Sequence, residues 1–244
     1  MNIAITLATT RRILAQLRHD RRTLALLVLV PSVLMILLRY VFDRPELFDR
    51  VGPMLLGLFP FTIMFIVTSV ATLRERTSGT LERLMTMPVG KLDLLLGYAL
   101  AFGLVALVQV GVVLAISLTW LGLDLTGSLG SLVLVAVLDA LLGMALGLFA
   151  SAFARTEFQA VQFMPAFVLP QALLCGLIMP REQMASWLEA VSAVLPLTYA
   201  VEGMQEIAGE SGFTGTLAAD VAVIAGFTVV ALLLGAVTLR RRTA

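Results

Sequence analysis

Six apolar stretches, each of about 20 residues or more, dominate this 244-residue sequence. A helix rises about 1.5 Å per residue, so about 20 apolar residues cross the ~30 Å hydrocarbon core of a bilayer. Hydrophobic residues make up 59% of the chain and charged residues only 14%, which is more apolar surface than one soluble core buries. The sequence therefore predicts an all-α membrane protein with six transmembrane helices. Their expected ranges are 24–42, 53–73, 94–121, 128–153, 160–179 and 217–239.

The basic residues predict how these spans are oriented, because Lys and Arg near span ends are retained in the cytoplasm. Most of the 17 basic residues precede the first span, follow the last, or lie between spans two and three. We therefore expect both termini to be cytoplasmic. Residues 1–23 place Ile3, Leu7, Leu14 and Leu17 at helical spacing, which predicts an N-terminal amphipathic interfacial helix. Residues 24–244 are expected to form one membrane domain.

Another apolar portion, residues 184–201, lies between the fifth and sixth spans. Pro196 interrupts it and Glu189 adds a charge, and a seventh crossing would place the arginines at 240–242 outside the cell. We therefore expect residues 181–216 to form an extracellular re-entrant or interfacial helical segment, with Trp187 and Tyr199 at headgroup depth.

The cytoplasmic loop 74–93 carries the most specific pattern in the chain. It predicts a short helix over residues 80–87, which Ser78 or Gly79 caps and Pro88 ends. Charged residues flank an apolar ridge formed by Leu81, Leu84 and Met85. Such a ridge suits docking into the groove of a partner. The alternative is a helical turn that packs on lipid headgroups.

The string Glu75-Arg-Thr-Ser-Gly-Thr-Leu-Glu-Arg-Leu-Met-Thr-Met-Pro-Val89 resembles the signature loop of type-2 ATP-binding-cassette (ABC) exporter permeases. The segment Leu195-Pro-Leu-Thr-Tyr-Ala-Val-Glu-Gly-Met204 is similar to the segment that leads into the last span of that family. Within the family, the chain looks most like the membrane subunit of daunorubicin-resistance drug-efflux systems.

This resemblance implies that the loop docks onto a separate cytoplasmic ABC ATPase subunit, present in two copies. It implies coupling residues Glu75, Arg76, Gly79, Thr80, Leu81, Glu82, Arg83, Leu84, Met85 and Pro88. It also implies an outer re-entrant motif of Pro196, Leu197, Thr198, Tyr199 and Glu202. A second permease protomer, identical or homologous, would complete the pathway in the inner membrane of a bacterium.

The sequence lacks the residues that several other functions require. Gly90-Lys91 lacks the glycine spacing and the hydroxyl of a phosphate-binding loop, so ATP and Mg²⁺ are expected on the partner ATPase and no cofactor on this chain. One cysteine, Cys175, and one histidine, His19, make neither a disulfide nor a zinc site. The motifs of hydrolytic enzymes and the filter loop of an ion channel are absent from the sequence, and a net charge of +1 gives no reason to propose nucleic acid.

Asp139 lies in the middle of the fourth span, where an ionisable group is costly and usually faces protein or water. One interpretation makes it a contact for a cationic substrate or a proton-responsive group. The other makes it a structural hydrogen-bonding group between helices, with Gln109 as its partner. Gly143 and Gly147 follow at a spacing that permits close helix approach.

Aromatic residues of the second and fifth spans form the remaining candidate site. By resemblance, these two spans border a central cavity, and their rings offer adaptable contact to hydrophobic molecules. The alternative is that each residue simply packs or faces lipid. The candidates are Phe59, Phe61, Phe65, Phe163 and Phe167, together with Gln109 and Asp139.

These observations predict the permease subunit of an ATP-driven exporter that moves hydrophobic or amphipathic compounds by alternating access. One alternative is export of a lipid-linked glycan or another cell-envelope precursor. A second alternative, from another class, is a membrane anchor or sensor that recruits a cytoplasmic ATPase without transporting anything.

Overall fold

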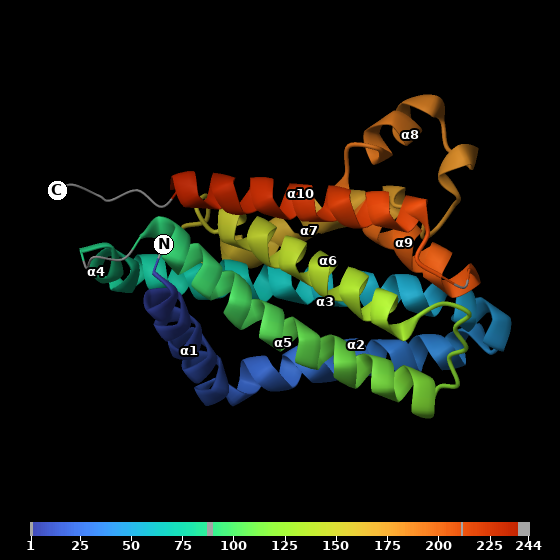
Figure 1. Cartoon of the computed structure of the whole chain (residues 1–244), viewed down its shortest axis with the longest axis horizontal. Helices are drawn as coiled ribbons and strands as arrows, with labels where there is room; N and C mark the ends of the chain where they lie inside the picture. The colour runs from blue at the N-terminus through green and yellow to red at the C-terminus, as the bar shows by residue number, and fades with distance from the viewer. Residues whose placement is uncertain (1, 87–89, 211, 239–244) are drawn as a thin grey trace.

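The computed structural model describes residues 2–86, 90–210 and 212–238, which form helices and connecting loops without any strand. Figure 1 shows long helices lying side by side, with α1 and α4 at one end and α8 projecting at the other. The helices are α1 (Ile3–His19), α2 (Arg21–Phe42), α3 (Pro45–Thr77), α4 (Thr80–Thr86), α5 (Lys91–Thr119), α6 (Leu129–Ala150), α7 (Glu157–Leu174), the 3₁₀ turn η1 (Arg181–Gln183), α8 (Ser186–Ser192), α9 (Pro196–Gly209) and α10 (Gly215–Thr238). The predicted all-helical class is confirmed.

Five helices among the described residues are long and apolar enough to cross a membrane, namely α2, α3, α5, α6 and α10. Each coincides with a predicted span. The helix at the fifth predicted span, α7, is not among them, because its glutamines and two internal prolines, Pro165 and Pro170, reduce its apolarity. The sixth crossing therefore stays a prediction.

Some helices begin or end at other residues than the predicted spans, because local capping fixes their ends. α3 begins at Pro45 rather than near residue 53, because a proline in the first turn lacks only an amide that would be unpaired there. Its 33 residues run past the predicted end at residue 73 to Thr77. The predicted last residue of the final span, Leu239, lies outside the described residues.

Close contact between α3 and α6 forms the centre of the bundle. A Cβ atom placed on Gly143 would lie 2.2 Å from the carbonyl oxygen of Phe61, and one on Gly147 would lie 2.3 Å from that of Phe65. The backbones of the two helices therefore touch where α6 carries no side chain. This confirms the close approach predicted from the glycine spacing.

The N-terminal helix α1 forms where it was predicted, but it docks through an unexpected face. Thr6, Thr9 and Thr10 are buried against α5, where Gly97 leaves room for them: a Cβ on Gly97 would lie 2.6 Å from Thr9. Ile3 and Leu7 remain exposed, whereas Leu17, expected on their side of the helix, is buried inside the protein. Small residues rather than apolar periodicity decide this contact.

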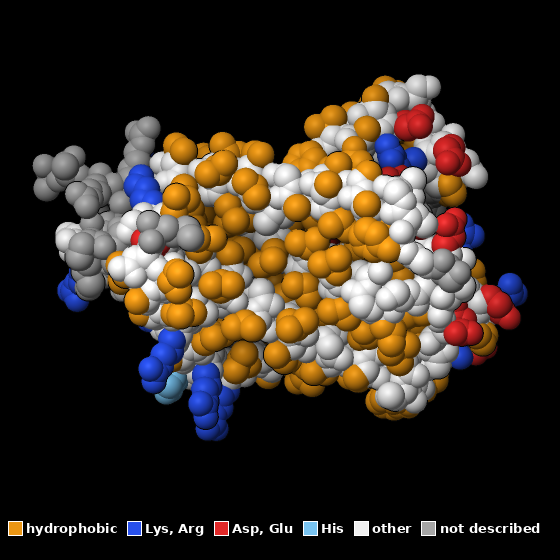
Figure 2. All heavy atoms as spheres, viewed as in Figure 1, with side chains coloured by type: hydrophobic (Ala, Val, Ile, Leu, Met, Phe, Trp, Pro, Cys, Tyr) orange, Lys and Arg blue, Asp and Glu red, His pale blue; other side chains and the backbone are white. Residues whose placement is uncertain are grey.

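Charges and apolar side chains are separated along the bundle. Figure 2 shows hydrophobic side chains over the middle of one face, Lys and Arg at the end where α1 lies, and acidic residues together with further Lys and Arg at the opposite end. We call the end that holds α1 and α4 the coupling end, after the predicted docking loop. We call the end that holds α8 and α9 the outer end, after the predicted outer motif. α9 packs on α3, α6 and α10 at the outer end, whereas η1 and α8 stand away from the bundle (Figure 1).

Candidate coupling site and outer motif

The last turn of α3 contacts five other elements at the coupling end. Three consecutive residues, Arg74, Glu75 and Arg76, point their side chains to different helices. They precede the predicted docking helix, which the structure describes as α4, by only a few residues. A shift of this loop would therefore act on several helices at once.

Glu75 is the most buried of the three and joins α3 to α1 and α5. Arg12 of α1 donates to it through two nitrogens, with Nη1 2.8 Å from Oε1 and Nη2 3.4 Å from Oε2. The hydroxyl of Tyr98, from α5, donates to the same carboxylate. The side chains of Arg12 and Glu75 are 26% and 11% exposed, so this ion pair is largely shielded from solvent.

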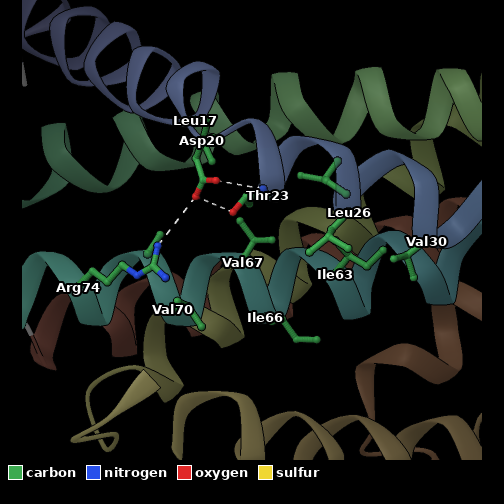
Figure 3. Close-up of a pocket in the computed structure, with 12 residues that line it drawn as sticks. Leu17, Asp20, Thr23, Leu26, Val30, Ile63, Ile66, Val67, Val70 and Arg74 are labelled. Carbon is green, nitrogen blue, oxygen red and sulfur yellow. Dashed lines mark hydrogen bonds and ion pairs between the residues drawn. The ribbon is translucent and has the colours of Figure 1, made fainter. Parts of the chain in front are cut away.

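The two arginines reach α7, the start of α2 and the end of α10. Arg74 binds Glu157 through two hydrogen bonds of 2.7 and 2.8 Å and lies 3.9 Å from the carboxylate of Asp20. Figure 3 shows Asp20 between Arg74 and Thr23. Arg76 donates to the hydroxyl of Thr238 at 3.2 Å and to its carbonyl oxygen at 3.4 Å.

The other flank of the loop, at the start of α5, is held by α1 as well. The backbone amide of Asn2 donates to Asp93 at 2.9 Å, and the hydroxyl of Thr10 donates to the carbonyl oxygen of Gly97 at 3.3 Å. α1 therefore contacts both chain segments that lead into the loop, through Glu75 on one side and Asp93 on the other.

α4 presents a mixed surface. Gly79 adopts a left-handed conformation with φ of 71°, which glycine accepts without strain and which separates α3 from α4. Leu81 is buried in this chain's own core, Leu84 is partly buried and Arg83 is exposed. Glu82 and Met85 belong to the same helix, which begins at Thr80, while Pro88 lies outside the described residues. Leu81 therefore anchors α4 to the bundle, and Leu84 stays partly accessible.

The predicted aromatic cavity residues of α3 and α7 do meet. The rings of Phe65 and Phe167 lie 5.9 Å apart, and those of Phe163 and Phe167 lie 6.5 Å apart. Phe61 and Phe65 are fully buried, and Phe59 is partly buried. Phe167 is 39% exposed, more than any other member of this cluster.

The expected hydrogen bond between Asp139 and Gln109 is absent, and that prediction is wrong. Both side chains are fully buried, and the polar atoms of both lack a partner among the described residues. Asp139 instead faces Gly57 of α3, where a Cβ would lie 3.5 Å from its Oδ2, next to Met204 of α9. Gln109 lies in α5 and Asp139 in α6, and no hydrogen bond joins these two described helices through the two side chains.

The predicted outer motif forms the N-terminal turn of α9, and its polar groups are bonded within this chain. Pro196 occupies the first turn, and the amide of Leu197 donates to the side chain of Gln171 from α7 at 3.3 Å. Thr198 donates to the carbonyl oxygen of Ser192 at 2.9 Å, and Tyr199 to that of Ala193 at 2.8 Å.

Glu202, one turn further along α9, pairs with Arg181 of η1. This pair borders an outer cavity of about 660 Å³ that Arg50, Met54, Cys175 and Gln205 also line. The motif therefore holds the projecting segment in place and shapes the wall of this cavity.

Sequence reasoning missed the residues that complete the coupling site, namely Arg12, Asp20, Arg74, Asp93, Tyr98, Glu157 and Thr238. The basic residues among them look like ordinary cytoplasmic anchors of the spans. Of these residues, only Arg74 has a signal in the sequence, because it directly precedes the loop motif that begins at Glu75.

The five apolar helices indicate a multi-pass helical membrane protein. Residues 4–208 match the family model described as "ABC-2 type transporter". The chain belongs to this family of ABC transporter permeases.

Several curated proteins are similar to the chain. It is 30% identical over 157 residues to a "Probable multidrug ABC transporter permease" of Escherichia coli, covering 64% of this chain and 43% of the relative. It is 28% identical over 169 residues to "ABC transporter G family member 20" of Dictyostelium discoideum, covering 68% and 23%. It is 26% identical over 152 residues to a "Linearmycin resistance permease protein" of Bacillus subtilis, covering 60% and 39%. The matched region spans less than half the length of these relatives.

Proposed function

We propose that this chain is the membrane permease subunit of an ATP-driven exporter that moves hydrophobic or amphipathic compounds out of the cell. A separate cytoplasmic ABC ATPase, in two copies, binds ATP and Mg²⁺ and acts on the loop around α4. A second permease protomer, identical or homologous, completes the pathway. The proposed location is the inner membrane of a bacterium, with both termini in the cytoplasm.

The observation that carries this proposal is the connectivity of the last turn of α3. Glu75 binds α1 and α5, Arg74 binds α7, and Arg76 binds α10. A push on the adjacent loop reaches these helices through hydrogen bonds that each involve a charged side chain, and such bonds are among the stronger polar contacts in proteins. This arrangement supports conversion of a movement at α4 into a change in the packing of the spans.

The proposal includes six crossings, with α7 as the fifth. Glu157, at the start of α7, binds Arg74 at the coupling end, whereas Cys175, directly after α7, lines the outer cavity. The 18 residues of α7 rise about 27 Å, close to the thickness of a hydrocarbon core. Thr238 of α10 binds Arg76 and therefore lies at the coupling end, where α1 begins. This placement supports an even number of crossings.

The substrate class is proposed from the aromatic cluster of α3 and α7 and from the names of two relatives. One relative is named as a multidrug permease and another as a linearmycin resistance permease. Phe167 offers an accessible ring at this cluster, and a flat apolar ligand gains from such contact.

The test purifies the chain from its native membrane together with the subunits that accompany it. We expect an ATPase with a phosphate-binding loop to co-purify in stoichiometric amount. Leu84→Asp should release that ATPase and abolish export, because a charge replaces the partly accessible apolar group on α4. Leu84→Met keeps the apolar volume and should retain both. Unchanged co-purification and export in Leu84→Asp would contradict the proposed docking site.

Transport itself needs a separate readout, because an anchor or sensor would also retain an ATPase. We expect purified complexes in proteoliposomes to show ATP hydrolysis that an amphipathic drug stimulates, with accumulation of that drug on the side opposite α4. Hydrolysis without drug movement would support the non-transporting alternative. Movement of a lipid-linked glycan in place of drugs would support the envelope-precursor alternative.

A further inference from the structure

A groove of about 330 Å³ opens between α2 and α3 at the coupling end of the bundle. Figure 3 shows Leu26 and Val30 of α2 opposite Ile63 and Val67 of α3. Leu26 is 61% exposed and Val30 39% exposed, so the groove is open to its surroundings. Its volume is within the range of sites that bind small ligands.

The length of the groove matches one leaflet of a bilayer. Its wall on α3 runs from Arg74 to Ile63, a separation of 11 positions that corresponds to about 16 Å along a helix. Half of a hydrocarbon core is about 15 Å thick. An acyl chain that begins at the depth of Arg74 would therefore end near the bilayer midplane at Ile63.

The mouth of the groove carries both signs of charge. Asp20, Thr23 and Arg74 line it together, and the side chains of Asp20 and Arg74 are 38% and 55% exposed. Nε and Nη2 of Arg74 bind Glu157, and Nη1 stays 3.9 Å from Asp20, so Nη1 is the nitrogen of Arg74 that remains open to a ligand. Arg21 and Arg22 are exposed directly beside the mouth.

We propose that this groove binds one membrane phospholipid with a zwitterionic headgroup of the phosphatidylethanolamine type. Its phosphate lies at Arg74, its ammonium lies at Asp20, and one acyl chain fills the apolar groove between Leu26 and Val67. The pairing of a guanidinium with a carboxylate at the mouth complements the two opposite charges of such a headgroup.

A second protein helix fits the same groove less well. It would cover Asp20 and Arg74 and remove two half-exposed charges from water, which costs free energy unless new partners satisfy them. A lipid headgroup leaves these side chains at the membrane surface, where water remains. The charge at the mouth therefore favours the lipid.

The test reconstitutes the full chain in phosphatidylcholine vesicles that contain a trace of phosphatidylethanolamine with a photoactivatable acyl chain. After illumination and digestion, mass spectrometry locates the labelled peptides. We expect labelling of residues 23–30 and 63–70 above that of the exposed face of α10, which includes Val229 and Leu233. Equal labelling of the two surfaces would overturn the proposal, because it indicates bulk lipid only.

Two variants fill the groove from opposite walls. Val67→Trp and Val30→Trp should each reduce groove labelling to the level of the α10 surface. Leu233→Trp adds the same side chain on α10, where Leu233 is 51% exposed, and should leave groove labelling unchanged. If either groove variant folds and keeps full labelling, the proposed site is wrong.

The headgroup has its own test. Unlabelled phosphatidylethanolamine should compete for groove labelling better than diacylglycerol, which has no phosphate, and Arg74→Gln should remove that advantage. Equal competition by the two lipids would overturn the assignment of the headgroup. A covalent dimer formed by Leu26→Cys in a Cys175→Ser background would show that a second copy covers the groove. None of these readouts depends on an ATPase or on transport, so their failure is distinguishable from failure of the proposed function.

Discussion

The guanidinium of Arg12 and the carboxylate of Glu75 lie 2.8 Å apart across 63 positions of sequence, and Tyr98 donates to the same carboxylate. This contact joins the N-terminal helix to the residue that begins the recognised loop motif. It gives α1 a definite role in the fold, because α1 holds the last turn of α3 against the first turns of α5.

Removal of Arg12 should destabilise the protein. Arg12→Met leaves Glu75 with the Tyr98 hydroxyl but without its cation, and we expect a loss of about 2 kcal/mol in the free energy of unfolding, measured by denaturant titration in detergent micelles. The neighbouring Arg11 is exposed, so Arg11→Met should change this free energy by less than about 0.5 kcal/mol. In the double variant with Glu75→Gln, the combined loss should be smaller than the sum of the single losses. Simple additivity would show that the two side chains do not interact in solution.

The contact between α3 and α6 should not tolerate even one added methyl group. In Gly143→Ala the new Cβ meets the carbonyl oxygen of Phe61 at 2.2 Å, and backbone atoms cannot yield as a flexible side chain does. We expect a loss of at least about 2 kcal/mol in the free energy of unfolding and a lower yield of folded protein. Gly111→Ala is the matched control, because Gly111 lies in α5 with nothing within 4 Å of the added carbon. It should be neutral or stabilise the helix by up to about 1 kcal/mol. Equal behaviour of the two variants would contradict the close packing.

Asp20 should make stability depend on acid pH. Hydrogen bonds from the hydroxyl and the amide of Thr23 hold the pKa of Asp20 below its ordinary value. A carboxyl with a lowered pKa stabilises the fold fully above its unfolded pKa of about 3.9, and this contribution is lost as the pH falls through the lower, folded value. Thermal unfolding midpoints between about pH 5 and pH 2 measure this loss.

Two substitutions separate the charge of Asp20 from its role as the N-terminal cap of α2. Asp20→Asn retains an acceptor for the helix amides, so it should flatten the pH dependence with little loss at neutral pH. Asp20→Ala removes the cap and should cost about 1 kcal/mol at pH 7. A pH profile in Asp20→Asn identical to that of the unchanged protein would assign the acid sensitivity to other groups.

Asp139 should contribute little to stability, because neither carboxylate oxygen has a hydrogen-bond partner among the described residues. Asp139→Asn has nearly the same shape, and we expect the same yield and an unfolding free energy that is equal or slightly higher. Export by the intact complex should fall if the carboxyl contacts a cationic substrate or responds to protons. A loss of more than about 2 kcal/mol would instead reveal a structural hydrogen bond at this position. Gln109→Leu is a suitable comparison, since that amide is equally buried and unpaired.

The amino-acid sequence was sufficient to predict the helical class, the five candidate spans, the close approach at the glycines of α6 and the position of α4. Each of these depends on information within one segment, because the bilayer requires a given length of apolar helix and because close helix packing requires small residues at a regular spacing. The family also follows from a local pattern, the loop between α3 and α5. These features do not depend on which other segment lies nearby.

The residues that complete the coupling site could be identified only from the packing of the helices. Arg12 and Glu75 are 63 positions apart, Arg74 and Glu157 are 83 apart, and Arg76 and Thr238 are 162 apart. A charged residue near a span end has many candidate partners of opposite sign, and charge alone does not select among them. A buried polar residue within one span likewise has several candidate partners in the other spans, which is why Gln109 was assigned wrongly to Asp139. The selection is made by the way α1, α7 and α10 pack around the end of α3, which follows from the fit of whole helix surfaces rather than from any single segment.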